Sequence, residues 1–156
     1  TATIASAETN LLSALGAAEG TPLADALAEF KAGAGDMVTL EMDGTTPNFA
    51  VNPEAPENVT AGVEGLKSAV ADIQTVVADL TELPAKVTAL IDASKTMPGE
   101  APAALKSAGL AAKDIMPAVK TVKNNVKATA QTPDRVTSTT AAATGFLSTI
   151  TGAFTE

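Results

Sequence analysis

Four lysines recur at seven-residue intervals and are the residues best placed for binding chemistry: Lys106, Lys113, Lys120 and Lys127. On a helix this spacing forms a nearly continuous basic line beside an apolar seam. Lys123 adds to the line, and Asp114 is the only acid between residues 102 and 130. The line has three interpretations: a docking strip for anionic lipid headgroups or an acidic protein partner, a match for the acidic residues of segment 36–57, or a solvated helix face.

Several reactive side chains are missing, because the chain contains no cysteine, histidine, tryptophan or tyrosine. It therefore has no thiolate nucleophile and no disulfide, and it lacks the side chain most used as a general base and transition-metal ligand. Carboxylate catalysis would need buried acids, whereas the acids here fall outside the apolar seams. The acidic segment also lacks the DxDxDG spacing of a calcium-binding loop. We expect no enzyme activity, no cofactor and no metal site.

Charge is divided unevenly along the chain. Eighteen acids oppose ten bases, and the net charge of −8 argues against nucleic acid as a partner, because phosphate binding needs a surplus of Lys and Arg. Residues 1–64 hold ten of the acids, with Lys31 as their only base. This asymmetry predicts that one part of the fold is acidic and another is close to neutral.

An apolar seam with alternating spacings of four and three predicts a long amphipathic helix over about residues 59–95. The seam consists of Val59, Val63, Leu66, Val70, Ile73, Val77, Leu80, Pro84, Val87 and Ile91. A second row widens it, formed by Ala69, Val76, Leu83 and Leu90. A stripe of this width is typical of a bundle helix that touches two neighbours.

Met97-Pro98-Gly99-Glu100 predicts a turn, and a second seam then predicts an antiparallel helix over about residues 101–130. Pro84 and Pro117 lie inside these two helices, where each removes a backbone hydrogen bond and bends its helix. The bends either curve the helices around a core or open a pocket for an apolar ligand. The candidate pocket residues are Leu80, Leu83, Ile115 and Val119.

Thr132-Pro133-Asp134 predicts the start of a last helix over about residues 133–154. Residues 136–155 carry no charge, but seven threonines and two serines make them too polar for a good membrane span. At the other end of the chain we expect a helix over about residues 3–32, broken at Gly20-Thr21-Pro22.

A long acidic connection over residues 33–58 should follow the first helix. Apolar and polar residues alternate on both sides of Asp43-Gly44, which fits a short β-hairpin. Prolines at positions 47, 53 and 56 favour irregular chain instead.

These elements predict an all-α fold, a single domain over residues 1–156 built as an up-and-down antiparallel four-helix bundle. The chain has 33 alanines and 22 threonines but only four phenylalanines. Small side chains should therefore fill most of the core, and the elements that pack must approach closely.

We expect a non-enzymatic interaction or structural module. The alternative is a carrier or binder of apolar small molecules or lipid, held between the bent helices. The small-residue start TATIASAET is typical of a processed exported protein or of a lipoprotein tether, so we expect a periplasmic, cell-surface or secreted location. Its partner would be a protein, an anionic membrane surface or an apolar ligand. If part of the wide apolar stripe of helix 59–95 stays exposed, it would also suit contact with a second copy of the chain in a dimer.

Overall fold

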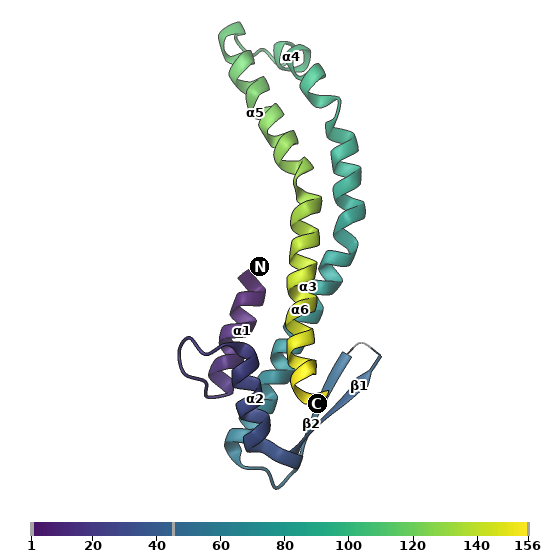
Figure 1. Ribbon diagram of the computed structural model, residues 1–156. Coiled ribbons are helices and arrows are strands. Elements are labelled where there is room, and N and C mark those ends of the chain that lie inside the picture. Colours follow the sequence, from purple (N-terminus) through teal and green to yellow (C-terminus); the bar gives the residue numbers. More distant parts are fainter. Residues whose placement is uncertain (1, 45, 156) are drawn as a thin grey trace. The chain divides into compact units, whose positions relative to one another are not determined.

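The computed structural model describes residues 2–44 and 46–155 and is mostly helical, at 78%, with one small antiparallel sheet (Figure 1). The described chain groups into two compact units. Unit 1 contains residues 1–78 and 139–156, and unit 2 contains residues 79–138. Two long helices contribute residues to both units, α3 (Glu57–Ser94) and α6 (Thr132–Thr155). The single domain expected from sequence stays a prediction.

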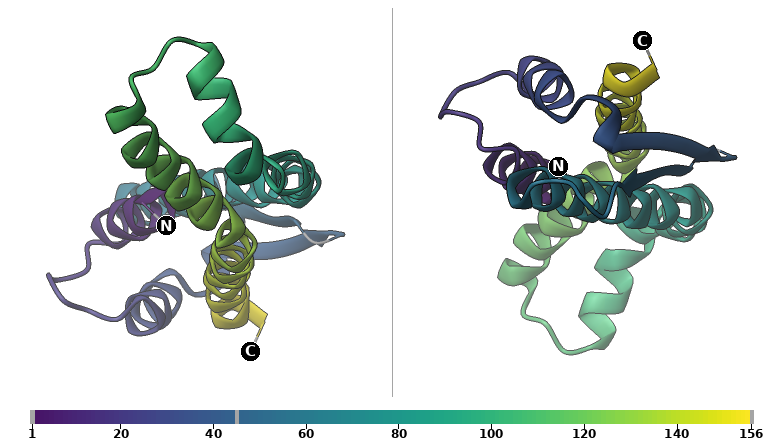
Figure 2. Two further views of the ribbon diagram at one scale, coloured as in Figure 1. Left: turned by 90° about the horizontal axis from the view of Figure 1, so that it is seen from above. Right: turned by 90° about the horizontal axis from the view of Figure 1, so that it is seen from below.

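Unit 1 begins with two short helices, α1 (Ala2–Ala14) and α2 (Leu23–Ala34), so the first predicted helix is broken as expected. The break is wider than predicted because α1 already ends at Ala14, and Gly16 follows with a φ of 70°, in the left-handed region. The amides of Gly16 and Ala17 donate to the carbonyls of Ser13 and Leu12, which closes the helix end. The connecting residues project from unit 1 as a loop (Figures 1 and 2).

The acidic connection contains the β-hairpin that the alternating pattern suggested, so the irregular chain that the prolines favoured is wrong for residues 38–43 and 46–51. A 3-10 turn, η1 (Gly35–Met37), leads into β1 (Val38–Asp43), which pairs antiparallel with β2 (Thr46–Val51). Pro47 lies opposite Met42 in this register, and a two-stranded sheet tolerates it because each strand is an edge strand. The prolines at 53 and 56 come after β2, in the segment that leads to α3.

The core of unit 1 contains residues from both ends of the chain. Its fully buried side chains include Leu11 of α1, Leu27 of α2, Phe49 of β2, Leu66 of α3 and Ile150 of α6. All four phenylalanines of the sequence belong to this unit. The ring of Phe154 packs edge-on against Phe49, with the ring centroids 5.1 Å apart, and against Phe30 at 6.5 Å.

Unit 2 differs from the predicted helix pair in the segment that joins the two helices. Residues 97–100, expected as a turn, form the first turn of α4 (Met97–Ser107), where Pro98 is tolerated because its missing N–H has no helical partner. The predicted helix 101–130 is instead the rest of α4 followed by α5 (Ala112–Ala130). Figure 2 shows α4 beside α5, with a loop between them.

Gly109 causes the division between α4 and α5. Its φ of 84° is left-handed, and its amide donates to the carbonyl of Lys106. The next amide, of Leu110, reaches back to the carbonyl of Leu105. This pair of bonds is the Schellman motif, which ends a helix at a glycine. Figure 1 shows the end of α3 and α5 running in opposite directions, as predicted, with α4 at the bend.

The predicted reversal between the third and fourth helices is absent. Only Gln131 separates α5 from α6, and its backbone stays in the helical region, at φ −87° and ψ −6°. Its amide donates to the carbonyl of Ala128 at 3.2 Å. Without a residue outside the helical region the chain continues in the same direction, so an up-and-down four-helix bundle is not clearly formed. Within the described residues, no helix is long and apolar enough to cross a membrane.

Candidate functional site

The predicted lysine line is divided between two helices. Lys106 belongs to α4, whereas Lys113, Lys120 and Lys127 belong to α5, and the left-handed turn at Gly109 interrupts the seven-residue spacing between the two groups. All four side chains are exposed. None of them forms an ion pair with another described residue, because the ion pairs found there join Lys86 to Glu82 and Lys95 to Asp92.

The α5 lysines share one face with an exposed methionine. Residues 113, 116, 120, 123 and 127 follow spacings of three and four, so their side chains lie along one side of the helix. We call this set the basic face of α5: Lys113, Met116, Lys120, Lys123 and Lys127. Each of the five is exposed, and Met116 is 73% exposed. The seam formed by Ile115, Val119, Val122 and Val126 runs beside this face and is buried or half-buried.

A hollow of about 550 Å³ lies on the basic face. Its lining comes from a short stretch of one helix, Met116, Pro117, Val119, Lys120 and Lys123. Since one helix supplies these walls, the hollow is a shallow surface groove floored by apolar atoms and lysine stems. Pro117 has no N–H to donate to the carbonyl of Lys113, one turn earlier, so the helix lacks one backbone hydrogen bond here.

The structure places the four predicted pocket residues in unit 2. Val119 is buried, at 6% exposure, and Leu80, Leu83 and Ile115 are half-buried. The groove beside Val119 is lined by other residues of α5 rather than by these three.

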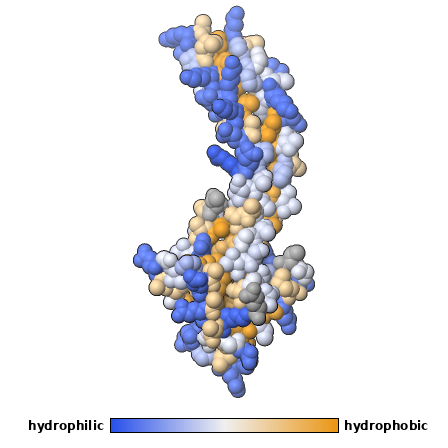
Figure 3. Space-filling model, viewed as in Figure 1, coloured by the Kyte–Doolittle hydropathy of each residue, from blue (hydrophilic) through white to orange (hydrophobic). Residues whose placement is uncertain are grey.

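Unit 2 leaves much of its apolar surface uncovered. Large apolar side chains that remain exposed there are Leu90 at 54%, Met97 at 48%, Leu110 at 38% and Met116 at 73%. Helix α4 buries none of its residues. The wide stripe of α3 shows the change along one helix, because Ala69 is buried, Leu83 is half-buried and Leu90 is exposed. Figure 3 shows apolar surface between hydrophilic side chains over unit 2.

The two units also differ in their charge. Unit 2 contains eight basic and six acidic residues, whereas unit 1 contains two basic and twelve acidic residues. The division agrees with the predicted asymmetry and places the cationic residues mainly in unit 2.

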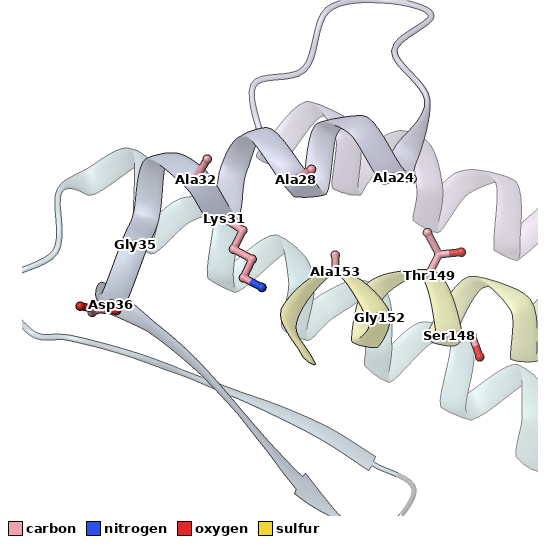
Figure 4. Close-up of a pocket in the computed structure, with 10 residues that line it drawn as sticks. All are labelled: Ala24, Ala28, Lys31, Ala32, Gly35, Asp36, Ser148, Thr149, Gly152 and Ala153. Carbon is pink, nitrogen blue, oxygen red and sulfur yellow. The ribbon is translucent and has the colours of Figure 1, made fainter. Parts of the chain in front are cut away.

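A second hollow, of about 750 Å³, lies in unit 1 and was not anticipated from the sequence (Figure 4). Residues of α2, η1 and the end of α6 line it: Ala24, Ala28, Lys31, Ala32, Gly35, Asp36, Ser148, Thr149, Gly152 and Ala153. The side chain of Lys31 extends into the space between α2 and α6, whereas that of Asp36 points away. Alanines spaced by four on α2, at positions 24, 28 and 32, are the sequence signal for this surface.

The described acids lie mostly at the surface. Among the described residues, Glu8 is half-buried and every other Asp and Glu is exposed. No group of three of them lies close enough together to hold a metal ion in the described parts of the chain. The buried polar side chain, Ser94, donates its hydroxyl to the backbone carbonyl of Leu90 and so has a local partner.

Comparison of the chain with protein-family models, with curated proteins and with solved structures finds no match.

Proposed function

We propose that this chain is a non-enzymatic interaction module and that unit 2 carries its contact surface. One observation carries the proposal: exposed apolar side chains lie beside unpaired lysines in unit 2, with Met116 of the basic face 73% exposed. Burying apolar surface contributes roughly 25 cal/mol per Å², so an uncovered set of large side chains favours association. Unit 1, in contrast, has a connected core of its own, and its exposed large apolar side chains are Met37 and Met42.

The arrangement of titratable groups supports a binding role rather than catalysis. A general acid or base is usually tuned by burial or by a close charged neighbour. The lysines of α5 are exposed and form no ion pair with a described residue, and the acids that do form one, Glu82 and Asp92, are exposed. A location outside the cytoplasm stays a prediction.

Cysteine labelling tests whether something covers this surface. The chain has no cysteine, so Met116→Cys provides a single thiol on the basic face, and Ser13→Cys provides a matched exposed thiol on α1. Each variant is labelled with a maleimide, once as purified protein and once in a detergent-free extract of its source. We expect labelling at position 116 to be several-fold slower in the extract, while the rate at position 13 changes little. Equal rates at position 116 in both samples would refute a covered contact surface in unit 2.

The groove beside Val119 favours a second candidate, the binding of an apolar small molecule or lipid. Met116, Pro117 and the stems of Lys120 and Lys123 supply apolar walls, and Leu80, Leu83 and Ile115 belong to the same unit. Native mass spectrometry of protein purified gently from its source should then show extra mass that leaves on activation. A bare mass would rule out a resident cargo.

A further inference from the structure

We infer that the occupant of the basic face of α5 is an anionic lipid surface, with Met116 inserted among the acyl chains and the lysines at the headgroups. The inference deepens the proposed function and rests on it, because it names the partner of the same surface. Four lysines with no ion pair to a described residue share this face with Met116.

Charge complementarity supports an anionic partner. Between residues 102 and 130, five lysines oppose the single acid Asp114, in a chain whose net charge is −8. Their concentration on two neighbouring helices makes unit 2 the only cationic part of an acidic molecule. A helix with this charge distribution is attracted to the negative surface potential of an anionic membrane.

The side-chain types favour lipid over a protein. Residues 79–138 contain no aromatic residue, and Arg135 is their only arginine. Protein interfaces are usually anchored by Tyr, Trp and Arg in a packed apolar centre, and carboxylates are best held by the planar fork of Arg. Lysines instead carry mobile point charges on long apolar stems, which suit the laterally mobile headgroups of a bilayer.

The apolar side chains also suit a fluid phase. Met116 has three rotatable bonds and a polarisable sulfur, so it adapts to irregular surroundings without a preformed socket. Met97 and Leu110, 48% and 38% exposed, belong to the adjoining α4 region and offer further apolar contacts.

Vesicle co-sedimentation tests the inference with a matched pair of variants. The first variant removes the lysines of the basic face, K113Q/K120Q/K123Q/K127Q. The control removes four lysines outside it, K31Q/K67Q/K86Q/K95Q, and so makes the same change in net charge. Both are compared with the unmodified protein on vesicles of phosphatidylcholine alone and of phosphatidylcholine with phosphatidylserine. The far-ultraviolet circular dichroism of each variant checks that the helices remain.

We expect the unmodified protein to bind the phosphatidylserine vesicles and to lose binding as salt is raised. The first variant should bind about a thousandfold more weakly, because each lysine near an anionic surface contributes separately, whereas the control should keep most of the affinity. Equal loss in both variants would contradict the inference, and so would equal binding to both kinds of vesicle.

A fluorescence measurement detects insertion directly. The chain has no tryptophan, so Met116→Trp supplies a single reporter, and Ser13→Trp is the exposed control on α1. The emission of the first should shift to the blue on phosphatidylserine vesicles, and that of the second should not shift. If neither vesicle binding nor a shift occurs while the thiol at position 116 is still protected in the source extract, the occupant is not an anionic lipid surface. In that case the lipid inference fails and the proposed function stands.

Discussion

At the scale of single residues, two glycines of α3 allow close approach of neighbouring elements. A Cβ atom on Gly62 would overlap the ring of Phe30, and one on Gly65 would overlap the Cβ of Ala14 in α1. Close approach was expected from the abundance of alanine, but the positions where it occurs required the structure. The Ala14 contact is the more rigid of the two, because its Cβ cannot move without the backbone of α1.

Gly65→Ala should therefore destabilise the protein. The overlap with Ala14 should cost about 1–3 kcal/mol, more than the ~1 kcal/mol that alanine gains over glycine in a helix. Urea unfolding followed by circular dichroism measures the net effect. Gly152→Ala in α6 is the control, because a Cβ there meets nothing within 4 Å and should stabilise the protein by about 0.5–1 kcal/mol. A Gly65 variant that is as stable as the Gly152 variant would disprove the close contact.

At the scale of elements, the most informative difference between expectation and structure is the division of the third predicted helix. The apolar spacing runs on through residues 101–130, so periodicity alone predicts one helix. Gly109 overrides it, because the left-handed backbone and the two Schellman bonds end α4 there. The Ala108-Gly109-Leu110 sequence carries this signal, but a glycine in a helical pattern is also compatible with an unbroken helix.

Replacing Gly109 tests this helix end. Gly109→Ala forces a side chain into the left-handed region, which costs about 1–2 kcal/mol. We expect a lower free energy of unfolding, measured in urea. Gly99→Ala provides the comparison within the same helix, because a Cβ at that position lies in open space with ordinary backbone geometry. An increase in stability and helicity on Gly109→Ala would mean that α4 and α5 merge into the single helix expected from the sequence.

At the scale of the whole molecule, apolar burial is distributed very unequally. Unit 1 holds the connected core that includes Phe49, Leu66 and Ile150, whereas the buried apolar residues of unit 2 are Val87, Val119 and Val136 among those described. Helices are held mainly by packing of an apolar face, so elements with little burial open more easily. The surface proposed for binding thus lies in the unit with fewer buried apolar residues.

Hydrogen exchange should show this difference. We expect the amides of α4, which has no buried residue, to exchange at least about tenfold faster than the α3 amides between residues 63 and 73. Mass spectrometry of peptides after timed labelling measures both segments in one sample. Equal protection of the two segments would contradict the assignment of the core to unit 1.

The sequence by itself determined where most helices lie and which residue types are available. Seam periodicity located α3 and α6 to within a few residues, since it depends only on neighbours along the chain. The broken start and the uneven charge followed from equally local signals, whereas the alternation and the prolines left the hairpin open against irregular chain. Composition also restricted the chemistry that the site could perform, because missing Cys and His side chains cannot be replaced by folding.

Only the tertiary structure decided which parts of the apolar stripes are covered. Ala69 and Leu90 look alike in the heptad pattern, yet the first is buried in unit 1 and the second is 54% exposed in unit 2. The direction of the chain after Gln131 likewise depended on one residue that stays helical. Burial and chain direction arise from contacts between residues far apart in sequence, and periodicity carries no information about them. For this reason the row of lysines could be predicted, whereas the exposure of Met116 beside them could not.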